Sequence, residues 1–311
     1  MLSHRQISSY QRLFSAIIVS LSLWSAPTTA AQSVVENPQT IGFSMVKTAS
    51  AGLTPEAVLV DSGSWFTLRR LAQNAVLIRH PQGDVLIDSG LGSNIEQQFS
   101  VNSFMNRQLF AYTDLDPAVE QFKRAGYPSA DVVKIIPTHL HWDHASGLED
   151  FPAAKIWVQQ QELEEAREGG APAHLQSQID GEQLQWHFLQ LNDQAYMGFD
   201  NTLDLYGDGS IVLVDLSGHS AGQIGIFLTI SSGKQFFFSG DTSWTTKGID
   251  DNAPRSSLIK WLVHLNWSDE KNEMQISKLH QLQKAHPDLT IVPAHDEIIL
   301  QDLPLFPQVS Y

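Results

Sequence analysis

Cysteine is absent from the 311-residue chain. Its absence excludes disulfides, thiolate nucleophiles, cysteine-ligated zinc, iron–sulfur clusters and lipid attachment to an N-terminal cysteine. Any metal ion bound here must therefore be held by histidine and carboxylate side chains. Basic residues are also few, because 19 Lys and Arg stand against 34 Asp and Glu and the formal net charge is −15. So acidic a chain is a poor partner for nucleic acid, and we expect none.

Long hydrophobic runs are missing as well. The apolar stretch at residues 13–24 is shorter than the roughly 20 residues that cross a bilayer. Arg5 and Arg12 precede it and small residues follow it, which is typical of a secretory signal. We predict a signal peptide over residues 1–31 that is cleaved near Ala31, a periplasmic or secreted location, and no membrane span after cleavage. The alternative is a short membrane anchor.

Short apolar runs separated by turn residues dominate the rest of the chain. Three pairs of runs predict hairpins, at residues 74–78 with 84–87, 203–206 with 211–214, and 224–229 with 235–238. Further strands are predicted at residues 132–136, 155–158 and 290–293. Helices are predicted at residues 117–125, 160–168, 256–264 and 269–285, the last with Ser268 as its N-cap.

This order of elements predicts an α+β fold in which two mostly antiparallel sheets pack together with helices outside. We find no linker, repeat or low-complexity tract, so we expect a single domain over residues 32–311. Residues 32–55 have no clear pattern. Two polar segments, residues 168–184 and 244–254, are predicted to be inserted loops. Glu162 and Glu165 are interpreted as a solvated helix face.

The 12 histidines carry the strongest chemical signal. The run Thr138-His-Leu-His-Trp-Asp-His144 follows the predicted strand 132–136 and holds four side chains that bind metal ions. They are His139, His141, Asp143 and His144. Imidazole and carboxylate suit zinc, and also manganese, iron or cobalt. A polar loop without a metal is the alternative, but these residue types seldom gather at a strand end without one.

Three more candidate ligands follow predicted strands downstream. His219 lies after the strand at 211–214, Asp241 ends Phe238-Ser-Gly-Asp241, and His295 follows the last strand. Small residues stand beside each of them, which lets the backbone turn sharply and lets an ion approach. Each alone is an ordinary loop residue, but their repeated placement at strand ends predicts one shared metal site.

With these motifs in order, the chain resembles the metallo-β-lactamase superfamily of metallohydrolases over about residues 58–300. The resemblance implies an αββα sandwich with a two-metal site at one edge of the sheets. It assigns His139, His141 and His219 to the first metal, Asp143, His144 and His295 to the second, and Asp241 to a bridge between them. Asp88, in Leu86-Ile-Asp-Ser-Gly90, matches an aspartate that supports the ligands without binding metal.

Within the superfamily the chain is most similar to the N-acyl homoserine lactonases, through residues 205–222 and 293–296. Those lactonases carry a tyrosine three residues after the bridging aspartate, where this chain has Trp244. An indole has a donor but cannot supply a proton as a phenol does. Trp244 is therefore a candidate for substrate contact or for simple packing in the pocket wall.

The resemblance implies an exported hydrolase that binds two divalent metal ions, with zinc expected. A hydroxide shared by the two ions would attack the carbonyl of a small lactone or ester, with Asp143 and Asp241 as catalytic residues and Asp143 as the proton relay. Two enzyme alternatives remain on the same site, a β-lactamase and an organophosphate hydrolase. The non-enzyme alternative is a metal-binding protein.

Overall fold

The computed structural model describes residues 40–264 and 266–311. The predicted signal peptide lies outside these residues. Within them, no helix is long and apolar enough to cross a membrane.

Seven strands form the first sheet, in the order β6-β1-β4-β5-β7-β8-β9. Their bounds are β1 Gly42–Ala51, β4 Ala72–Arg79, β5 Asp84–Ile87, β6 Tyr112–Thr113, β7 Val132–Ile136, β8 Lys155–Val158 and β9 Gln185–Phe188. The β6-β1-β4-β5 half pairs antiparallel, whereas β5, β7, β8 and β9 run parallel. The parallel half places the ends of β5 and β7 side by side, which positions the loops that follow them.

Six strands form the second sheet, in the order β10-β11-β12-β13-β14-β15. Their bounds are β10 Asn192–Tyr196, β11 Phe199–Asp204, β12 Ile211–Asp215, β13 Ile224–Thr229, β14 Gln235–Phe238 and β15 Thr290–Val292. All its pairs are antiparallel except β14 with β15. The three predicted hairpins are confirmed as the antiparallel pairs β4-β5, β11-β12 and β13-β14. A separate ribbon pairs β2 (Thr54–Pro55) with β3 (Leu68–Arg69).

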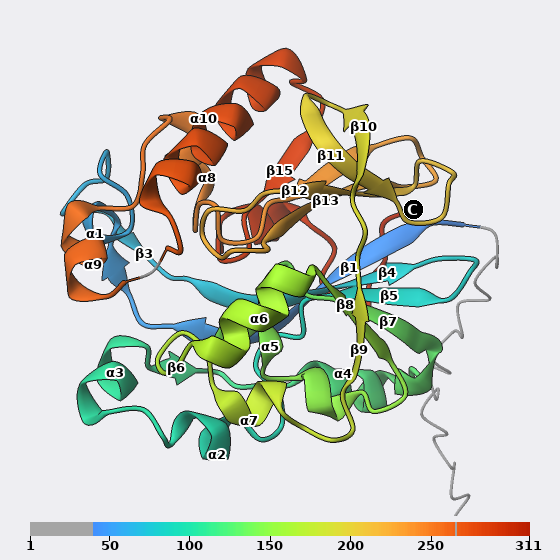
Figure 1. Cartoon of the computed structure of the whole chain (residues 1–311), viewed down its shortest axis with the longest axis horizontal. Helices are drawn as coiled ribbons and strands as arrows, with labels where there is room; N and C mark the ends of the chain where they lie inside the picture. The colour runs from blue at the N-terminus through green and yellow to red at the C-terminus, as the bar shows by residue number, and fades with distance from the viewer. Residues whose placement is uncertain (1–39, 265) are drawn as a thin grey trace, which may run out of the picture. The chain divides into compact units, whose positions relative to one another are not determined.

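Helices cover the outer face of each sheet (Figure 1). Those on the first sheet's side include α4, α6 and α7, and those on the second sheet's side include α8 and α10. The α-helices are α1 Glu56–Leu59, α2 Ile95–Phe99, α3 Phe104–Leu109, α4 Ala118–Ala125, α5 Trp142–Ala145, α6 Gln160–Glu168, α7 Gln176–Ile179, α8 Thr246–Asp250, α9 Ser257–Leu262 and α10 Asp269–Ala285. Three short 3₁₀ turns are Ser129–Asp131, Leu148–Asp150 and Ile299–Asp302. The predicted αββα sandwich is confirmed.

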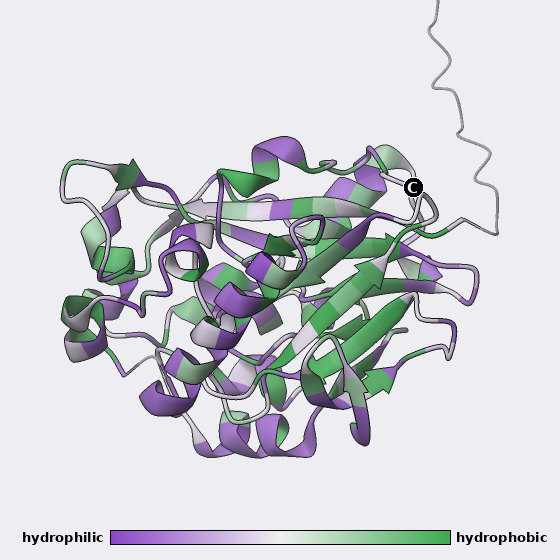
Figure 2. Ribbon diagram, turned by 90° about the horizontal axis from the view of Figure 1, so that it is seen from above, coloured by the Kyte–Doolittle hydropathy of each residue, from purple (hydrophilic) through white to green (hydrophobic). Residues whose placement is uncertain are grey.

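The central strands of the two sheets, such as β4 and β14, are apolar on both faces, and both faces are covered (Figure 2). On β4, Val76 and Ile78 belong to the cluster between the two sheets. Ala75 and Leu77 alternate with them and face the cluster under α4 and α6. A third cluster, which includes Phe237 of β14, packs the second sheet against α8 and α10. Burial of these layers fixes which strand ends meet at the edge of the sandwich.

Some elements match the sequence prediction and others differ from it. The longest helix is as predicted, and the Ser268 side chain accepts a hydrogen bond from the Lys271 N–H. Residues 42–51, which had no clear pattern, form β1. Its serine and threonine side chains are buried, and the Ser44 hydroxyl donates to the Gln308 carbonyl at 2.5 Å. The two predicted loops contain the short helices α7 and α8.

Candidate metal centre

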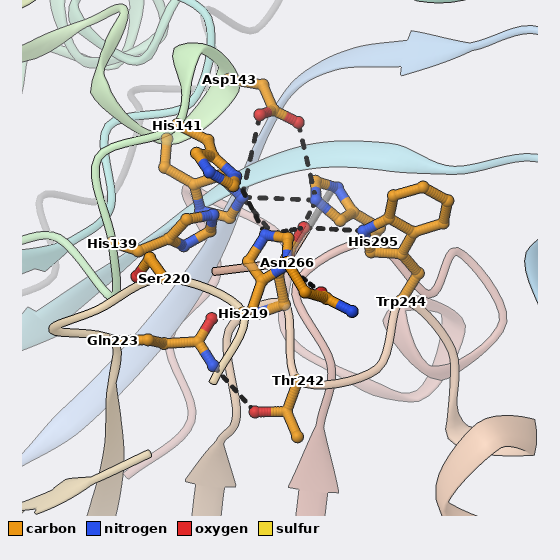
Figure 3. A network of polar contacts seen from close by, with 12 residues as sticks. His139, His141, Asp143, His219, Ser220, Gln223, Thr242, Trp244, Asn266 and His295 are labelled. Carbon is orange, nitrogen blue, oxygen red and sulfur yellow. Dashed lines mark hydrogen bonds and ion pairs between the residues drawn. The ribbon is translucent and has the colours of Figure 1, made fainter. Parts of the chain in front are cut away.

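The predicted ligands meet because each follows a strand that ends at the same edge of the sandwich. Pro137 ends β7, since proline cannot donate to the sheet, and the following turn carries four of them into α5. The loop after β12 carries His219, the loop after β14 carries Asp241 and the loop after β15 carries His295. Gly240 has a φ of 52° and packs on Thr138, which lets Asp241 turn into the cluster. Figure 3 shows these side chains converging.

Two groups of ligand atoms result, and a third, made of His139, His144 and Asp241, overlaps both of them. In one group, nitrogen atoms of His139, His141 and His219 lie within 4.8 Å of one another. His219 Nε2 is 2.9 Å from His141 Nδ1. In the other group, Asp143, His144 and His295 lie equally close, and the two imidazole Nε2 atoms are 3.3 Å apart.

Asp241 lies between the two groups. Its Oδ1 is 2.9 Å from His295 Nε2 and 3.3 Å from His144 Nε2. Its Oδ2 is 3.6 Å from His219 Nε2. One carboxylate thus faces imidazoles of both groups, as a bridging ligand would. Asp143 is the most exposed of the seven, and its Oδ2 lies 3.5 Å from His295 Nε2.

Residues around the centre fix the outer nitrogens of three imidazoles. His144 Nδ1 lies 2.9 Å from the carboxylate of Asp88, which also accepts from the Thr138 N–H. His295 Nδ1 bonds the Ala72 carbonyl at 2.8 Å. His219 Nδ1 bonds Asn266 Oδ1 at 2.9 Å. An imidazole held by a hydrogen bond at one nitrogen points the lone pair of its other nitrogen toward the centre. This is the arrangement of metal-bound histidines.

The donor set fits divalent metal ions. The six candidate ligands other than Asp143 are all buried, and His139 Nε2 has no hydrogen-bond partner among the described residues. A buried nitrogen left without a partner costs free energy, which a bound cation would offset. Mixed imidazole and carboxylate ligands without sulfur suit zinc and its first-row neighbours. The donor set is therefore suited to divalent metal ions, with Asp241 facing both groups.

Burial and charge shift the ionisation of these groups in opposite directions. Burial holds the pKa of His139 and His141 well below the ordinary value, and burial with Arg255 lowers the pKa of His219 to about 3. These imidazoles are therefore neutral and able to bind metal. Burial opposes ionisation of Asp241, but the neighbouring imidazoles, His295 first, hold its pKa well below the usual range. Burial opposes protonation of His144 and His295 as well, but neighbouring carboxylates raise the pKa of both, chiefly Asp88 for His144 and Asp241 for His295. The centre thus keeps the Asp241 anion beside these two protonated imidazoles, while the three-imidazole group is neutral.

Trp244 contacts the centre through its indole. Its Nε1–H donates to Asp241 Oδ2 at 2.7 Å, and the ring faces the guanidinium of Arg255 at 4.7 Å. Arg255 is buried and donates to the Asp241 carbonyl and, at 2.8 Å, to Asn266 Oδ1. The single donor of the indole is thus committed to Asp241. Trp244 therefore both bonds Asp241 and lines the cavity wall.

A cavity of about 660 Å³ opens above the centre. The seven-ligand cluster contributes His141, Asp143, His219, Asp241 and His295 to its lining. Its walls come from residues 51–59, 106–111, 170–173 and 259–264, and they are largely apolar. The lining contains no lysine or arginine among the described residues. The volume lies in the range of small-molecule sites.

Three residues near the centre were not predicted from the sequence. Glu162 was interpreted as part of a solvated helix face, but it is 1% exposed and hydrogen-bonds two of the ligand-bearing loops. His174 is buried with its ring 4.9 Å from that of His141. Arg255 lies beneath Asp241. Packing between segments far apart in the sequence brings these three residues to the centre. The local signals in the sequence are weak, namely the turn residues Gly169-Gly170 before His174 and Pro254 before Arg255.

Comparison with known proteins identifies the family. The model of the metallo-beta-lactamase superfamily matches residues 68–295. The N-acyl homoserine lactonase AttM of Rhizobium radiobacter is 28% identical over 229 residues, which cover 71% of this chain and 80% of the relative. A probable metallo-hydrolase of Mycobacterium bovis is 27% identical over 240 residues, covering 73% and 76%.

The fold is also shared with solved structures. A variant of AiiA from Bacillus thuringiensis, with N-decanoyl-L-homoserine at its active site, has a TM-score of 0.66 and 21% identity, covering 88% of this chain and 99% of that chain. The chain therefore belongs to the metallo-beta-lactamase superfamily. Its similarity to lactonases confirms the resemblance seen in the motifs, and the relatives are hydrolases, the class that the motifs predict.

Proposed function

We propose that the protein is a binuclear metal-dependent hydrolase that opens a lactone or cleaves a related ester. The observation that supports this proposal most strongly is the pair of ligand groups joined by Asp241 at the floor of an open cavity. When bound, two divalent ions would supply a nucleophile from water near neutral pH and would polarise a carbonyl oxygen. The all-imidazole and carboxylate donor set supports zinc as the metal.

The side chains of this chain then have separate roles. Asp241 joins the two ligand groups and fixes their separation. Asp143 is the most exposed carboxylate of the cluster and lines the cavity, so we assign to it the proton that the leaving alkoxide must take up. Trp244 cannot supply that proton, because its N–H is bonded to Asp241 and an indole does not ionise in the accessible range.

The cavity supports an uncharged substrate with an apolar group. A bound carboxylate or phosphate monoester is usually met by arginine or lysine, and none lines the cavity within the described residues. Leu53, Leu59, Phe110 and Ile259 are among the apolar wall residues. A neutral lactone or ester carrying an acyl chain matches this lining. A β-lactam, which carries a carboxylate, matches it less well.

A neutral phosphotriester is the second candidate substrate, since the same cation-free lining admits it. The open cavity above the ligands favours either enzyme over a protein that only stores metal. We also propose that the protein acts outside the cytoplasm, after removal of residues 1–31. The support is the charged, apolar and small-residue pattern of that segment.

A turnover panel tests the proposed reaction. The mature protein, loaded with Zn²⁺, is assayed with N-acyl homoserine lactones of several chain lengths, aryl esters, phosphotriesters and β-lactams. We expect lactones or esters to give the highest kcat/KM and β-lactams the lowest. Preference for β-lactams would overturn the substrate class, and absence of any turnover with two bound ions would favour a metal-binding protein.

A further inference from the structure

Helix α6 lies against the two loops that carry the three-imidazole group. From this helix, Glu162 enters the interior with 1% of its surface exposed. Its Oε1 accepts the Leu140 N–H at 2.7 Å. Its Oε2 accepts the Ser220 hydroxyl at 2.6 Å and the Gly222 N–H at 2.9 Å. One carboxylate therefore binds both loops.

The bonded positions are neighbours of the ligands in sequence. Leu140 stands between His139 and His141, and Ser220 follows His219. Figure 3 shows Ser220 beside this group of imidazoles. Glu162 thus connects the backbone segments of all three side chains, because its carboxylate bonds residues next to the histidines rather than the imidazoles themselves. Displacing either segment would change the spacing of the three nitrogens.

Other side chains on and beside α6 hydrogen-bond the 219–222 loop, whereas Glu162 also bonds the 138–144 turn. Glu165 accepts the Ala221 N–H at 2.5 Å, and the Gln159 amide donates to the Gly222 carbonyl at 3.2 Å. A Cβ on Gly222 would lie 2.6 Å from the Glu162 Cβ, so the loop packs directly on the helix. Within these contacts, Glu162 is the residue that spans from the 219–222 loop to the 138–144 turn.

We propose that Glu162 is a positioning residue that sets the spacing of His139, His141 and His219 and so tunes the metal affinity of that group. The proposal rests on the proposed two-metal centre. We expect the effect to be largest at that group, because the bonded residues Leu140 and Ser220 adjoin its three histidines in sequence, whereas Asp143 and His144 lie farther along the 138–144 turn.

The bonding pattern requires a carboxylate. All three partners of Glu162 are donors, and a carboxylate offers acceptors alone. In Glu162→Gln, either orientation of the amide turns its NH₂ against a backbone N–H, of Leu140 or of Gly222. An unpaired or opposed buried donor is costly, so the two loops should separate locally. The variant keeps the size of the side chain, which limits any effect on packing.

The experiment compares Glu162→Gln with Glu164→Gln, an exposed glutamate on the same helix that bonds only Gln160. Affinities for two successive Zn²⁺ ions are measured by chelator competition, and melting temperatures are recorded on metal-free protein. His141→Ala and His295→Ala identify which ion belongs to which group. We expect Glu162→Gln to weaken the ion affected by His141→Ala about tenfold and the other less than threefold. Glu164→Gln should match the wild type.

Two results would overturn the proposal. One is unchanged affinity for both ions in Glu162→Gln, and the other is equal weakening of both ions together with a lower melting temperature. If Glu162→Gln does not fold, Ser220→Ala decides, because it removes one donor and leaves the carboxylate. It should weaken the same ion about threefold, and no effect would overturn the proposal. Failure of the wild type to bind two ions would instead reject the proposed centre itself.

Discussion

At the scale of single residues, the centre combines ligands that the sequence reveals with supports that it hides. The seven ligand candidates follow strands, so a local pattern of apolar run, small residue and histidine or aspartate was enough to find them. The structure brings all seven together. Glu162, His174 and Arg255 could not be found in this way, because only contacts between distant segments bury them.

Asp241 offers the sharpest residue-scale prediction. Asp241→Asn keeps the shape of the side chain but removes the anion that faces both ligand groups. We expect lower occupancy of one metal and a loss of turnover of about 10²-fold, equivalent to about 2.7 kcal/mol of transition-state stabilisation. Metal analysis and steady-state kinetics measure both.

The same variant should still fold. The backbone of Asp241 is held by Gln223, which accepts its N–H at 3.1 Å, and by Arg255, and neither contact uses the carboxylate. We expect a melting temperature of the metal-free variant near that of the wild type. Normal metal content and turnover would show that Asp241 serves only to shape its loop.

His174 gives a prediction for pH dependence. Burial lowers its pKa to about 4 from an ordinary value of 6.5. The unfolded chain therefore takes up this proton first as the pH falls, so the stability contributed by neutral His174 is present above pH 6.5 and is lost toward pH 4.

His174→Gln removes this proton uptake. Relative to the wild type, the metal-free variant should gain about 1.4 kcal/mol of unfolding free energy per pH unit from pH 6.5 down to pH 5. Urea unfolding at several pH values measures the difference, with the exposed His286→Gln as control. Parallel pH curves for His174→Gln and the wild type would contradict the assignment.

At the scale of elements, strands and long helices were predictable where one feature decided them. The apolar run of β7, the turns that join β4 to β5, β11 to β12 and β13 to β14, and the N-cap of α10 are all local features. β1 was not predictable, because its buried polar side chains interrupt the apolar pattern and find their partners far along the chain. Short helices such as α7 depend on tertiary contacts rather than on their own periodicity.

The contact between α6 and the 219–222 loop is testable at one glycine. A methyl group in Gly222→Ala would lie 2.6 Å from the Glu162 Cβ, so helix and loop must move apart. We expect a loss of about 1–3 kcal/mol in unfolding free energy, measured by urea denaturation. Gly52→Ala is the control, since a Cβ there meets nothing within 4 Å. Equal stability of the two variants would mean that the loop yields without cost.

At the scale of the whole molecule, the sandwich holds the ligands and the surrounding loops shape the cavity. The layer order follows from the apolar strands, and the sequence resemblance predicted it correctly. The cavity walls could not be predicted, because residues 51–59, 106–111, 170–173 and 259–264 meet only in the folded chain. The side chains from these segments that line the cavity are largely apolar and include no lysine or arginine among the described residues, which supports an uncharged substrate.

The proposed export also concerns the whole molecule, and it predicts how the chain is processed. Expressed with residues 1–31 in a bacterium that has a periplasm, the protein should be recovered outside the cytoplasm with a new N-terminus at Ala31 or Gln32. N-terminal sequencing of the purified protein measures this. Recovery of cytoplasmic protein that still begins at Met1 would show that the segment is not a signal peptide.

The most direct test of the account follows metal content and activity together. Metal-free mature protein is titrated with Zn²⁺, and bound metal and turnover of an N-acyl homoserine lactone or an aryl ester are measured at each step. We predict that bound metal saturates at about two ions per chain, because Asp241 faces both ligand groups, and that turnover is complete only at that point. Full turnover with a single bound ion at saturation would contradict it.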